Sequence, residues 1–245
     1  MDGYLLDRRL SESVRLDAQH LLWKLQTGYA LHPDIPIKDD MKIADIGTGT
    51  GVWLLDIEND LPKTVNLDGF DISDSQFPPA HTLPANVHFG VLDALEDIPS
   101  KLAGRYDVVH LRMWCCVIKG NDPTQLIEAA YKLLKPGGYL QWEDVHGGRQ
   151  VVHGEAATKL NRLILHYQTD MLKESLVSMY STTALLGILG AFNATQGNNH
   201  GISLPAMGEI EKLVASALGE VKNGGALHWI PMVVLAKKGW GCASR

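Results

Sequence analysis

Cysteine is scarce in this sequence, and its basic residues do not outnumber its acidic ones. The three cysteines, Cys115, Cys116 and Cys242, are odd in number and two of them are adjacent, which is typical of reduced thiols and excludes a disulfide framework. The ten histidines form no HExxH or CxxC-type cluster, so we expect no metal site. The 22 Lys and Arg residues against 28 Asp and Glu leave a net charge of −6, which argues against nucleic acid as a partner.

Long hydrophobic runs are also absent. No stretch approaches the roughly 20 apolar residues that span a bilayer, and residues 1–4 lack the charged-then-apolar order of a signal peptide. We therefore expect a cytoplasmic protein with no membrane partner. With 245 residues, 45% of them hydrophobic, the chain can bury the core of one sizeable domain. Its acidic balance favours a small molecule as the ligand, and the sequence sets no oligomeric state.

Strand and helix patterns alternate through most of the chain. This alternation predicts an α/β fold of the doubly wound kind, in which a mostly parallel sheet is covered on both faces. The strands are expected at 42–46, 65–71, 87–92, 106–112, 139–144 and 228–237, and the helices at 11–27, 51–60, 123–135 and 205–218.

A helical stripe between about residues 155 and 190 interrupts this alternation. We expect a cap over the carboxyl ends of the strands there, or alternatively an ordinary packing helix, since an apolar stripe reports burial and nothing more. Residues 180–204 match no pattern. The apolar residues of the stripe are Leu160, Leu163, Ile164, Tyr167, Met171 and Leu172.

A glycine-rich bend follows the first expected strand, in the segment Ile43-Ala44-Asp45-Ile46-Gly47-Thr48-Gly49-Thr50-Gly51. Glycine reaches positive φ cheaply and lets a ligand approach the backbone, and a helix that starts at once adds N–H groups that favour polar or anionic groups. A dinucleotide fingerprint needs its third glycine where Val52 stands. A turn without any ligand is the alternative.

The motif Asp45-x-Gly47-x-Gly49-x-Gly51 resembles that of the class I S-adenosylmethionine-dependent methyltransferases. The strand Tyr106 to His110 and the turn Leu134 to Gly138 resemble the same family. Tyr4-Leu5-Leu6, the run Ser13 to His20 and the pair Val52-Trp53 are similar to fungal methyltransferases of secondary metabolism. The resemblance implies a seven-stranded Rossmann-like sheet, S-adenosyl-L-methionine as the cofactor, and methyl transfer to an O, N or S atom of a small molecule.

Acidic residues stand at two further strand ends of the expected sheet. Asp71, 20 positions after Gly51, can accept hydrogen bonds from both ribose hydroxyls, or alternatively cap the next segment. Asp93 can accept the adenine amino group beside the small Ala94, or alternatively cap a turn. The expected cofactor-binding residues are Asp45, Gly47, Thr48, Gly49, Gly51, Asp71, Ile72, Asp93, Ala94, Arg112 and Met113.

In the fungal family the N-terminal segment folds over the cofactor and lines the substrate pocket. This implies substrate-binding roles for Tyr4, Arg15 and Gln19, unless they belong to a plain docking helix. Trp114 can face a sulfonium, since an aromatic face attracts a cation, or pack in the core. His20 and His146 are the candidate general bases, whereas His110 lies inside a strand and is expected to be a satisfied core histidine.

We expect four segments: an N-terminal helical lid at 1–40, a cofactor-binding core at 41–150, a helical cap with the substrate region at 151–204, and a C-terminal helix and strand at 205–245 that complete the sheet. Two other classes of function remain open, because a fold does not fix a function. One is a cofactor-binding regulator or scaffold, and the other is an enzyme that uses the same pocket for a non-methyl reaction such as a cyclisation.

Overall fold

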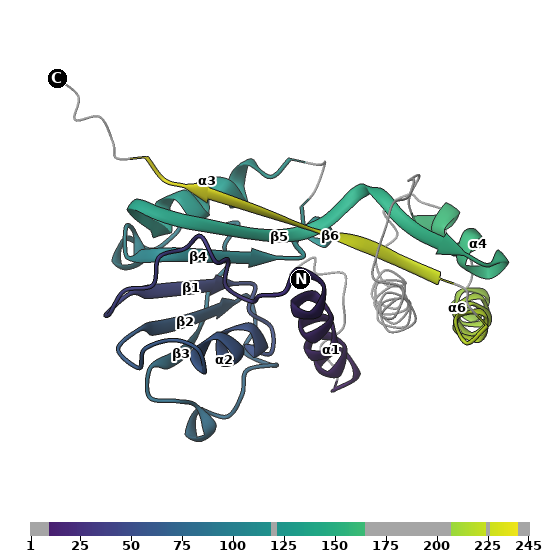
Figure 1. Ribbon diagram of the computed structural model, residues 1–245, viewed down its shortest axis with the longest axis horizontal. Helices are drawn as coiled ribbons and strands as arrows, with labels where there is room; N and C mark the ends of the chain where they lie inside the picture. Colours follow the sequence, from purple (N-terminus) through teal and green to yellow (C-terminus); the bar gives the residue numbers. More distant parts are fainter. Residues whose placement is uncertain (1–9, 119–121, 165–206, 224–225, 240–245) are drawn as a thin grey trace. The chain divides into compact units, whose positions relative to one another are not determined.

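The computed structural model of the chain describes residues 10–118, 122–164, 207–223 and 226–239, which belong to two compact units (Figure 1). One unit, called here the sheet unit, comprises Gly28–Asp144 and Val233–Arg245. The other, the helical unit, comprises Met1–Thr27 and Val145–Met232. Tyr4, the expected cap beyond residue 164 and the segment 180–204 lie outside the described residues.

A six-stranded sheet runs in the order β3-β2-β1-β4-β5-β6. The pairs β1 with β2, β1 with β4, β2 with β3 and β4 with β5 are all parallel, and β6 runs opposite to β5 (Figure 1). This confirms the predicted doubly wound α/β fold. The strands are β1 (Lys42–Ile46), β2 (Asn66–Asp71), β3 (Val87–Val91), β4 (Tyr106–Arg112), β5 (Leu134–His153) and β6 (Ala226–Lys237).

The strand count differs slightly from the expected seven, since the described residues form six strands. β5 also continues to His153, past the predicted end at residue 144. Val151 and Val152 explain part of this length, because β-branched residues favour extended backbone. Gly147 and Gly148 lie within the strand, since a glycine weakens a strand without ending it.

Each of the predicted helices outside the cap is present within a few residues of its expected bounds. In the helical unit α4 contacts α6, where the Glu220 carboxylate accepts a hydrogen bond of 3.0 Å from the Ala156 N–H. None of the described helices is long and apolar enough to cross a bilayer. The helices are α1 (Leu10–Thr27), α2 (Val52–Glu58), α3 (Thr124–Leu133), α4 (Glu155–Ile164) and α6 (Met207–Val221).

Two hydrophobic cores lie on opposite faces of the sheet, because successive side chains of a strand point to opposite sides. In β1, Ile43 packs in one core and Ala44 in the other. Helix α2 contributes Trp53, Leu54 and Ile57 to the first core, and helix α3 contributes Leu126, Ala129, Ala130 and Leu133 to the second. The two helices therefore hold the sheet from both sides and fix the edge at which β1, β2 and β4 end.

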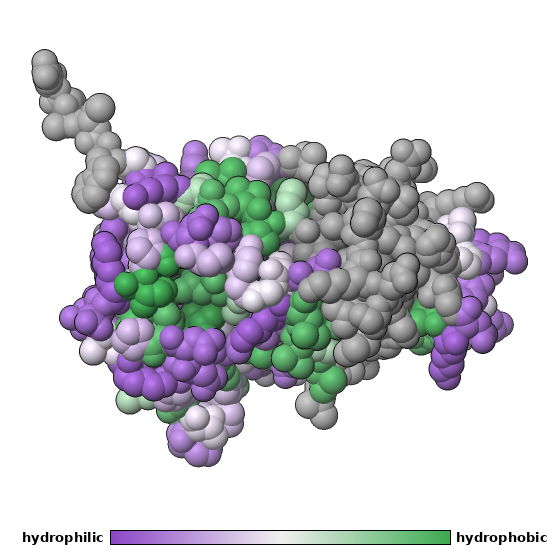
Figure 2. All heavy atoms as spheres, viewed as in Figure 1, coloured by the Kyte–Doolittle hydropathy of each residue, from purple (hydrophilic) through white to green (hydrophobic). Residues whose placement is uncertain are grey.

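The described surface mixes polar residues with hydrophobic patches (Figure 2). Helix α3 supplies part of the exposed apolar surface, because Ile127 is 45% exposed and Tyr131 is 55% exposed. Its neighbour Leu126 is only 1% exposed. One helix thus carries a buried and an exposed apolar residue at adjacent positions.

This pair gives a matched test of the core. We expect Leu126→Ala to lower the free energy of unfolding by about 2–5 kcal/mol, because it leaves a cavity between α3 and the sheet. Ile127→Ala should change it by less than about 1 kcal/mol, since surface substitutions have small effects. Urea denaturation followed by circular dichroism measures both. Equal losses for the two variants would contradict the packing of α3 described here.

Candidate cofactor site

The glycine bend adopts a left-handed backbone at each of its three glycines. Gly47, Gly49 and Gly51 have φ angles of 74°, 54° and 72°, a region that side chains larger than glycine's rarely adopt. The N–H groups of Gly47 and Thr48 donate to the Phe70 carbonyl at 2.8 and 2.9 Å. The bend at residues 47–51, called here the glycine loop, is therefore tied to the end of β2.

Aromatic side chains pack against two of these glycines. A Cβ at Gly47 would lie 3.1 Å from the Trp114 ring, and one at Gly51 would clash with the Phe89 ring. Trp114 is 8% exposed and its Nε1 donates to the Ile46 carbonyl at 3.1 Å. The core alternative for Trp114 is thus the one observed, and its role in substrate binding stays a prediction.

Asp71 lies directly against the glycine loop. Its Oδ2 accepts a hydrogen bond of 2.9 Å from the Gly49 N–H, and its Oδ1 accepts one of 3.3 Å from the Ser73 N–H. The bond from Ser73 is the local cap of the next segment considered as an alternative, while the bond from Gly49 joins the same carboxylate to the loop. The fold thus brings the Asp71 carboxylate, at the end of one strand, next to the glycines that follow another strand. Ile72 follows Asp71 in the sequence.

The end of β3 lies beside the end of β2, where the Leu92 N–H donates to the Asp71 carbonyl at 2.9 Å. Asp93 Oδ1 accepts a hydrogen bond of 2.9 Å from the Leu95 N–H, which is the turn cap considered as an alternative. This bond leaves the second oxygen of the carboxylate to other partners. Ala94 is buried at 3% exposure. The adenine role of Asp93 and Ala94 stays a prediction.

Met113 joins the end of β4 to the middle of β5. It has a φ of 58°, and its N–H donates to the Glu143 carbonyl at 2.9 Å. The Cys115 N–H donates to Asp144 Oδ2 at 3.0 Å. A left-handed residue other than glycine costs on the order of 1–3 kcal/mol, and such residues cluster at binding and catalytic sites.

Three buried ionisable side chains form a chain behind the glycine loop. Asp45, His110 and Glu143 are 3%, 1% and 1% exposed. Asp45 Oδ1 lies 2.7 Å from His110 Nδ1, and Asp45 Oδ2 accepts a hydrogen bond of 2.7 Å from the Thr48 hydroxyl. His110 Nε2 faces Glu143 Oε2 at 3.4 Å, and Arg112 Nη1 lies 3.6 Å from the same oxygen. We call these five side chains, Thr48 included, the buried network.

Strand register explains how the buried network forms. Asp45 pairs with His110 across β1 and β4, and Arg112 pairs with Glu143 across β4 and β5. The sequence predicted His110 to be a core histidine but did not predict its two carboxylate partners. The missed signal is the alternation of β4 and β5, which puts Gln141, Glu143 and His110 on one face.

The network shifts the pKa of each of its buried acids and of its histidine. Burial raises the pKa of Asp45, but the charge of His110 and the hydrogen bonds from His110 and Thr48 outweigh burial and hold it below 3.8. Burial likewise raises the pKa of Glu143, yet its contact with His110 and the charge of Arg112 bring it below 4.5. Burial lowers the pKa of His110, but Asp45 and then Glu143 raise it above 6.5.

Neutral groups hold the buried network in place. The Trp53 ring stacks on the His110 ring, with centroids 3.8 Å apart and planes 2° from parallel. Trp53 Nε1 donates to the Ala30 carbonyl at 3.1 Å, and Gln141 Nε2 donates to the same carbonyl at 2.8 Å. Gln141 Nε2 also donates to Glu143 Oε1 at 2.6 Å. The segment after α1 is thus fastened to the same buried groups.

The remaining predicted residues belong to the helical unit. Arg15 and His20 lie on α1 at 4% and 1% exposure, and Arg15 Nε donates to Glu12 at 2.8 Å. Gln19 is on the same helix, and His146 lies on β5. Their roles toward substrate stay predictions.

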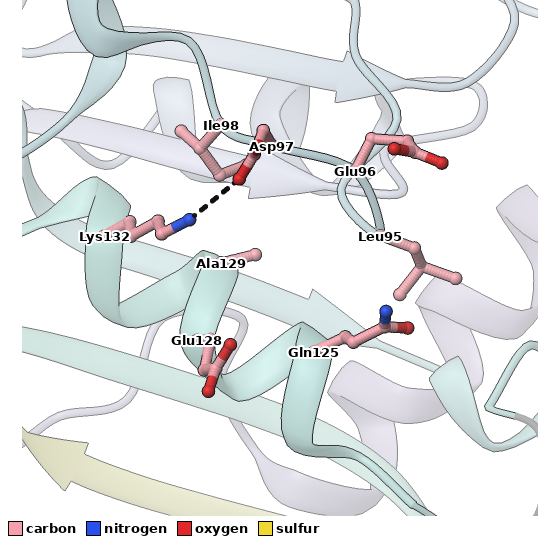
Figure 3. A pocket seen from close by; sticks show the side chains of 8 residues that line it. All are labelled: Leu95, Glu96, Asp97, Ile98, Gln125, Glu128, Ala129 and Lys132. Atoms are coloured by element: carbon pink, nitrogen blue, oxygen red, sulfur yellow. Dashed lines mark hydrogen bonds and ion pairs between the residues drawn. The ribbon is translucent and has the colours of Figure 1, made fainter.

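A hollow of about 230 Å³ lies between α3 and residues 95–98 (Figure 3). Lys132 Nζ and Asp97 Oδ1, two of its lining groups, are 3.2 Å apart. None of the expected site residues lines it. Across residues 10–118, 122–164, 207–223 and 226–239, no three His, Cys, Asp or Glu side chains are grouped to hold a metal ion. The lining residues are Leu95, Glu96, Asp97, Ile98, Gln125, Glu128, Ala129 and Lys132.

Comparison with known families agrees with the class that the fold and the glycine loop define. A family described as "Methyltransferase domain" matches residues 24–195, which is more than half of the chain. The chain belongs to this family, which confirms the predicted class.

Two similar proteins come from fungi. Methyltransferase grgD from Penicillium sp is 36% identical over 152 residues, which is 59% of this chain and 53% of that protein. N-methyltransferase verN from Clonostachys rogersoniana is 29% identical over 191 residues, 78% of this chain and 66% of that protein. The chain therefore spans between half and two thirds of the length of these relatives.

Among solved structures, this chain is similar to Haemonchus contortus phosphoethanolamine N-methyltransferase 2 in complex with S-adenosyl-L-methionine. The two are 18% identical, the match covers 91% of this chain and 52% of that chain, and the TM-score is 0.48.

The pKa shifts of the buried network predict how stability depends on pH. His110 has a raised pKa in the folded protein, so its contribution is complete below about pH 6.5 and is lost as pH rises through the folded pKa. Asp45 and Glu143 have lowered pKa values, so the stability that they contribute is complete above about pH 4.5 and is lost as pH falls. We expect stability to be greatest between these limits.

Urea denaturation at stepped pH measures this profile, with His110→Gln as the comparison. The free energy of unfolding of the wild type should decline above about pH 6.5 more steeply than that of the variant, because glutamine carries no titrating proton. If the free energies of unfolding of the two proteins decline in parallel above about pH 6.5, His110 does not titrate as described.

Proposed function

We propose that this chain is a methyltransferase that uses S-adenosyl-L-methionine and moves a methyl group to an O, N or S atom of a small molecule of secondary metabolism. The observation that best supports this function is the glycine loop at the end of β1. Its three glycines have positive φ angles, and its Gly49 N–H is bonded to the Asp71 carboxylate at the end of β2. Ligands of doubly wound sheets bind at this edge. Membership of the methyltransferase domain family supports the same reaction.

The charge of the strand ends fits a cationic cofactor better than a phosphate-bearing one. Asp71 ends β2, Asp93 follows β3, and Asp144 lies beside the end of β4, where it accepts a hydrogen bond from the Cys115 N–H. Asp45 and Glu143 belong to the buried network, where His110 and Arg112 accompany them. A pyrophosphate would meet like charges here, whereas a sulfonium and an ammonium group meet complementary ones. The cofactor of this chain is therefore S-adenosyl-L-methionine.

The roles of the cofactor-binding residues follow from these positions. Asp71 would hold the ribose hydroxyls, because its carboxylate ends β2 and lies against the glycine loop at the edge where ligands of doubly wound sheets bind. Asp93 and Ala94 would receive the adenine. Gly47, Gly49 and Gly51 would shape the loop that presents its backbone to the cofactor, with Gly47 and Gly51 also making room for the rings of Trp114 and Phe89, and Arg112 and Met113 would line the sulfonium end. Asp45 and Thr48 would shape the loop from behind.

When bound, the cofactor supplies an electrophilic methyl group, which is attached to a positively charged sulfur. The protein then has mainly to orient the acceptor, a contribution of about 7–11 kcal/mol. A general base would help a hydroxyl or thiol acceptor by about 10²–10⁴ in rate, and His20 and His146 are the candidates. Arg15, Gln19, Trp114 and Tyr4 remain the proposed substrate residues.

The name N-methyltransferase, carried by the relative from Clonostachys rogersoniana, makes a nitrogen acceptor the first to test. Small amines and amides of fungal metabolism are suitable candidates. The division into lid, core, cap and C-terminal segment is part of this proposal, since it assigns cofactor and acceptor to different segments.

The proposal is tested by calorimetry with S-adenosyl-L-methionine, followed by incubation with methyl-labelled cofactor and candidate acceptors. Binding together with label in a product supports the function. Binding without turnover on any acceptor class would favour a regulator or a cyclase, and failure of the wild-type chain to bind the cofactor would refute the proposal.

Asp71 gives the sharpest prediction for the cofactor. We expect Asp71→Ala to weaken the binding of S-adenosyl-L-methionine by about 1.5–3 kcal/mol, because hydrogen bonds to a charged acceptor are lost. Asp74→Ala is a matched control, since this acid is exposed in the same connection and lies three positions away. Calorimetry on both variants decides it. An unchanged dissociation constant for Asp71→Ala would remove Asp71 from the site.

A further inference from the structure

The glycine loop is connected to the sheet by a side chain as well as by its backbone. The Thr48 hydroxyl donates to Asp45 Oδ2 at 2.7 Å, while the other oxygen of the same carboxylate lies 2.7 Å from His110 Nδ1. The orientation of Asp45 is thus set from one side by the loop and from the other by β4. A change at His110 would therefore shift the Asp45 carboxylate and, through it, the position of Thr48 in the loop.

Both ring nitrogens of His110 face carboxylate oxygens. Nδ1 faces Asp45 at 2.7 Å and Nε2 faces Glu143 at 3.4 Å. A neutral imidazole has a lone pair on one nitrogen, which would point at a negative oxygen. A protonated ring donates Nδ1–H to Asp45 and places its positive charge beside Glu143, which it contacts as an ion pair without a hydrogen bond.

The charges around His110 balance only when the ring is cationic. Asp45 approaches it from β1, Glu143 from β5, and Arg112 lies on its own strand with Nη1 3.6 Å from Glu143. Tyr29, whose pKa Glu143 helps to raise, approaches Glu143 from the segment after α1. Two carboxylates against two cations leave no net charge, whereas a neutral ring would leave one buried negative charge uncompensated, which is costly.

The plane of the ring is fixed as well as its charge. Trp53 of α2 stacks on it at 3.8 Å, and an aromatic face attracts a cation. Trp53 and Gln141 are both anchored on the Ala30 carbonyl. His110 therefore has little freedom to turn away from Asp45.

We infer that His110, as a buried imidazolium, is the positioning residue of the cofactor loop: it holds Asp45 in the orientation that fixes Thr48 and the left-handed bend at 47–51. This inference rests on the proposed function, because the ligand of the loop is taken to be S-adenosyl-L-methionine. It adds a requirement that the glycine motif alone does not contain, namely a cation on the neighbouring strand. His110 acts through Asp45 and does not touch the reacting atoms.

The test uses three variants of the full chain and S-adenosyl-L-homocysteine as the calorimetric probe. Thr48→Val removes the hydroxyl and should raise the dissociation constant by about 10-fold or more, since it leaves a buried charged acceptor without its donor. Thr48→Ser restores the hydroxyl and should recover most of that loss. His110→Gln should raise the dissociation constant by a similar factor and should remove its dependence on pH above about pH 6.5.

Nitrogen NMR of the wild-type His110 ring completes the test, because it needs neither the probe nor a folded variant. Signals of two protonated ring nitrogens at pH 7 agree with the inference, and a neutral ring overturns it. The inference is also overturned if Thr48→Val and His110→Gln both bind the probe as tightly as the wild type does. Absence of wild-type binding refutes the proposed function instead, while the NMR result still reports on the imidazolium. A variant that loses affinity with an unchanged free energy of unfolding separates positioning from a merely structural role.

Discussion

The contact between Asp45 and His110 is the interaction on which the cofactor edge of the sheet depends. Both side chains are almost fully buried and lie 2.7 Å apart on adjacent parallel strands. A buried carboxylate is tolerated only when it is paired, because its desolvation is not recovered otherwise. The pair thus couples the register of β1 and β4 to the shape of the glycine loop, since Thr48 is bonded to the same carboxylate.

The glycine loop shows how local strain and long-range contacts compensate each other. Three glycines with positive φ make the bend accessible, and a residue with a side chain, Met113, adopts a left-handed conformation at the neighbouring strand end. Such backbone persists only when surrounding bonds over-determine it. Those bonds come from the Phe70 carbonyl, from Asp71 and from the Glu143 carbonyl. The shape of the glycine loop therefore relies on strands that are distant in sequence.

The sequence predicts the elements of the fold well, because hydrophobic periodicity and glycine spacing are local signals. The strands that contain Asp45, Asp71 and His110 and the helices on either side were predicted close to their observed bounds. The partners of His110 were not predicted, since Asp45 and His110 are 65 residues apart and only strand register brings them together. The length of β5 was also missed, since the strand continues to His153 beyond the predicted end at residue 144.

The predicted cofactor residues lie in one unit, and most of the predicted acceptor residues lie in the other. All eleven proposed cofactor residues lie in the sheet unit, whereas Arg15, Gln19, His20 and His146 belong to the helical unit. The sheet itself holds the proposed cofactor residues in place, so their positions depend on register and packing within one unit. Among the proposed acceptor residues, Trp114 lies in the sheet unit and His146 lies on β5, whereas Arg15, Gln19 and His20 lie on α1 and can vary without disturbing the buried network. A fold of this kind can keep one methyl donor while its acceptor changes, because function lies in sites that the fold supports and not in the fold alone.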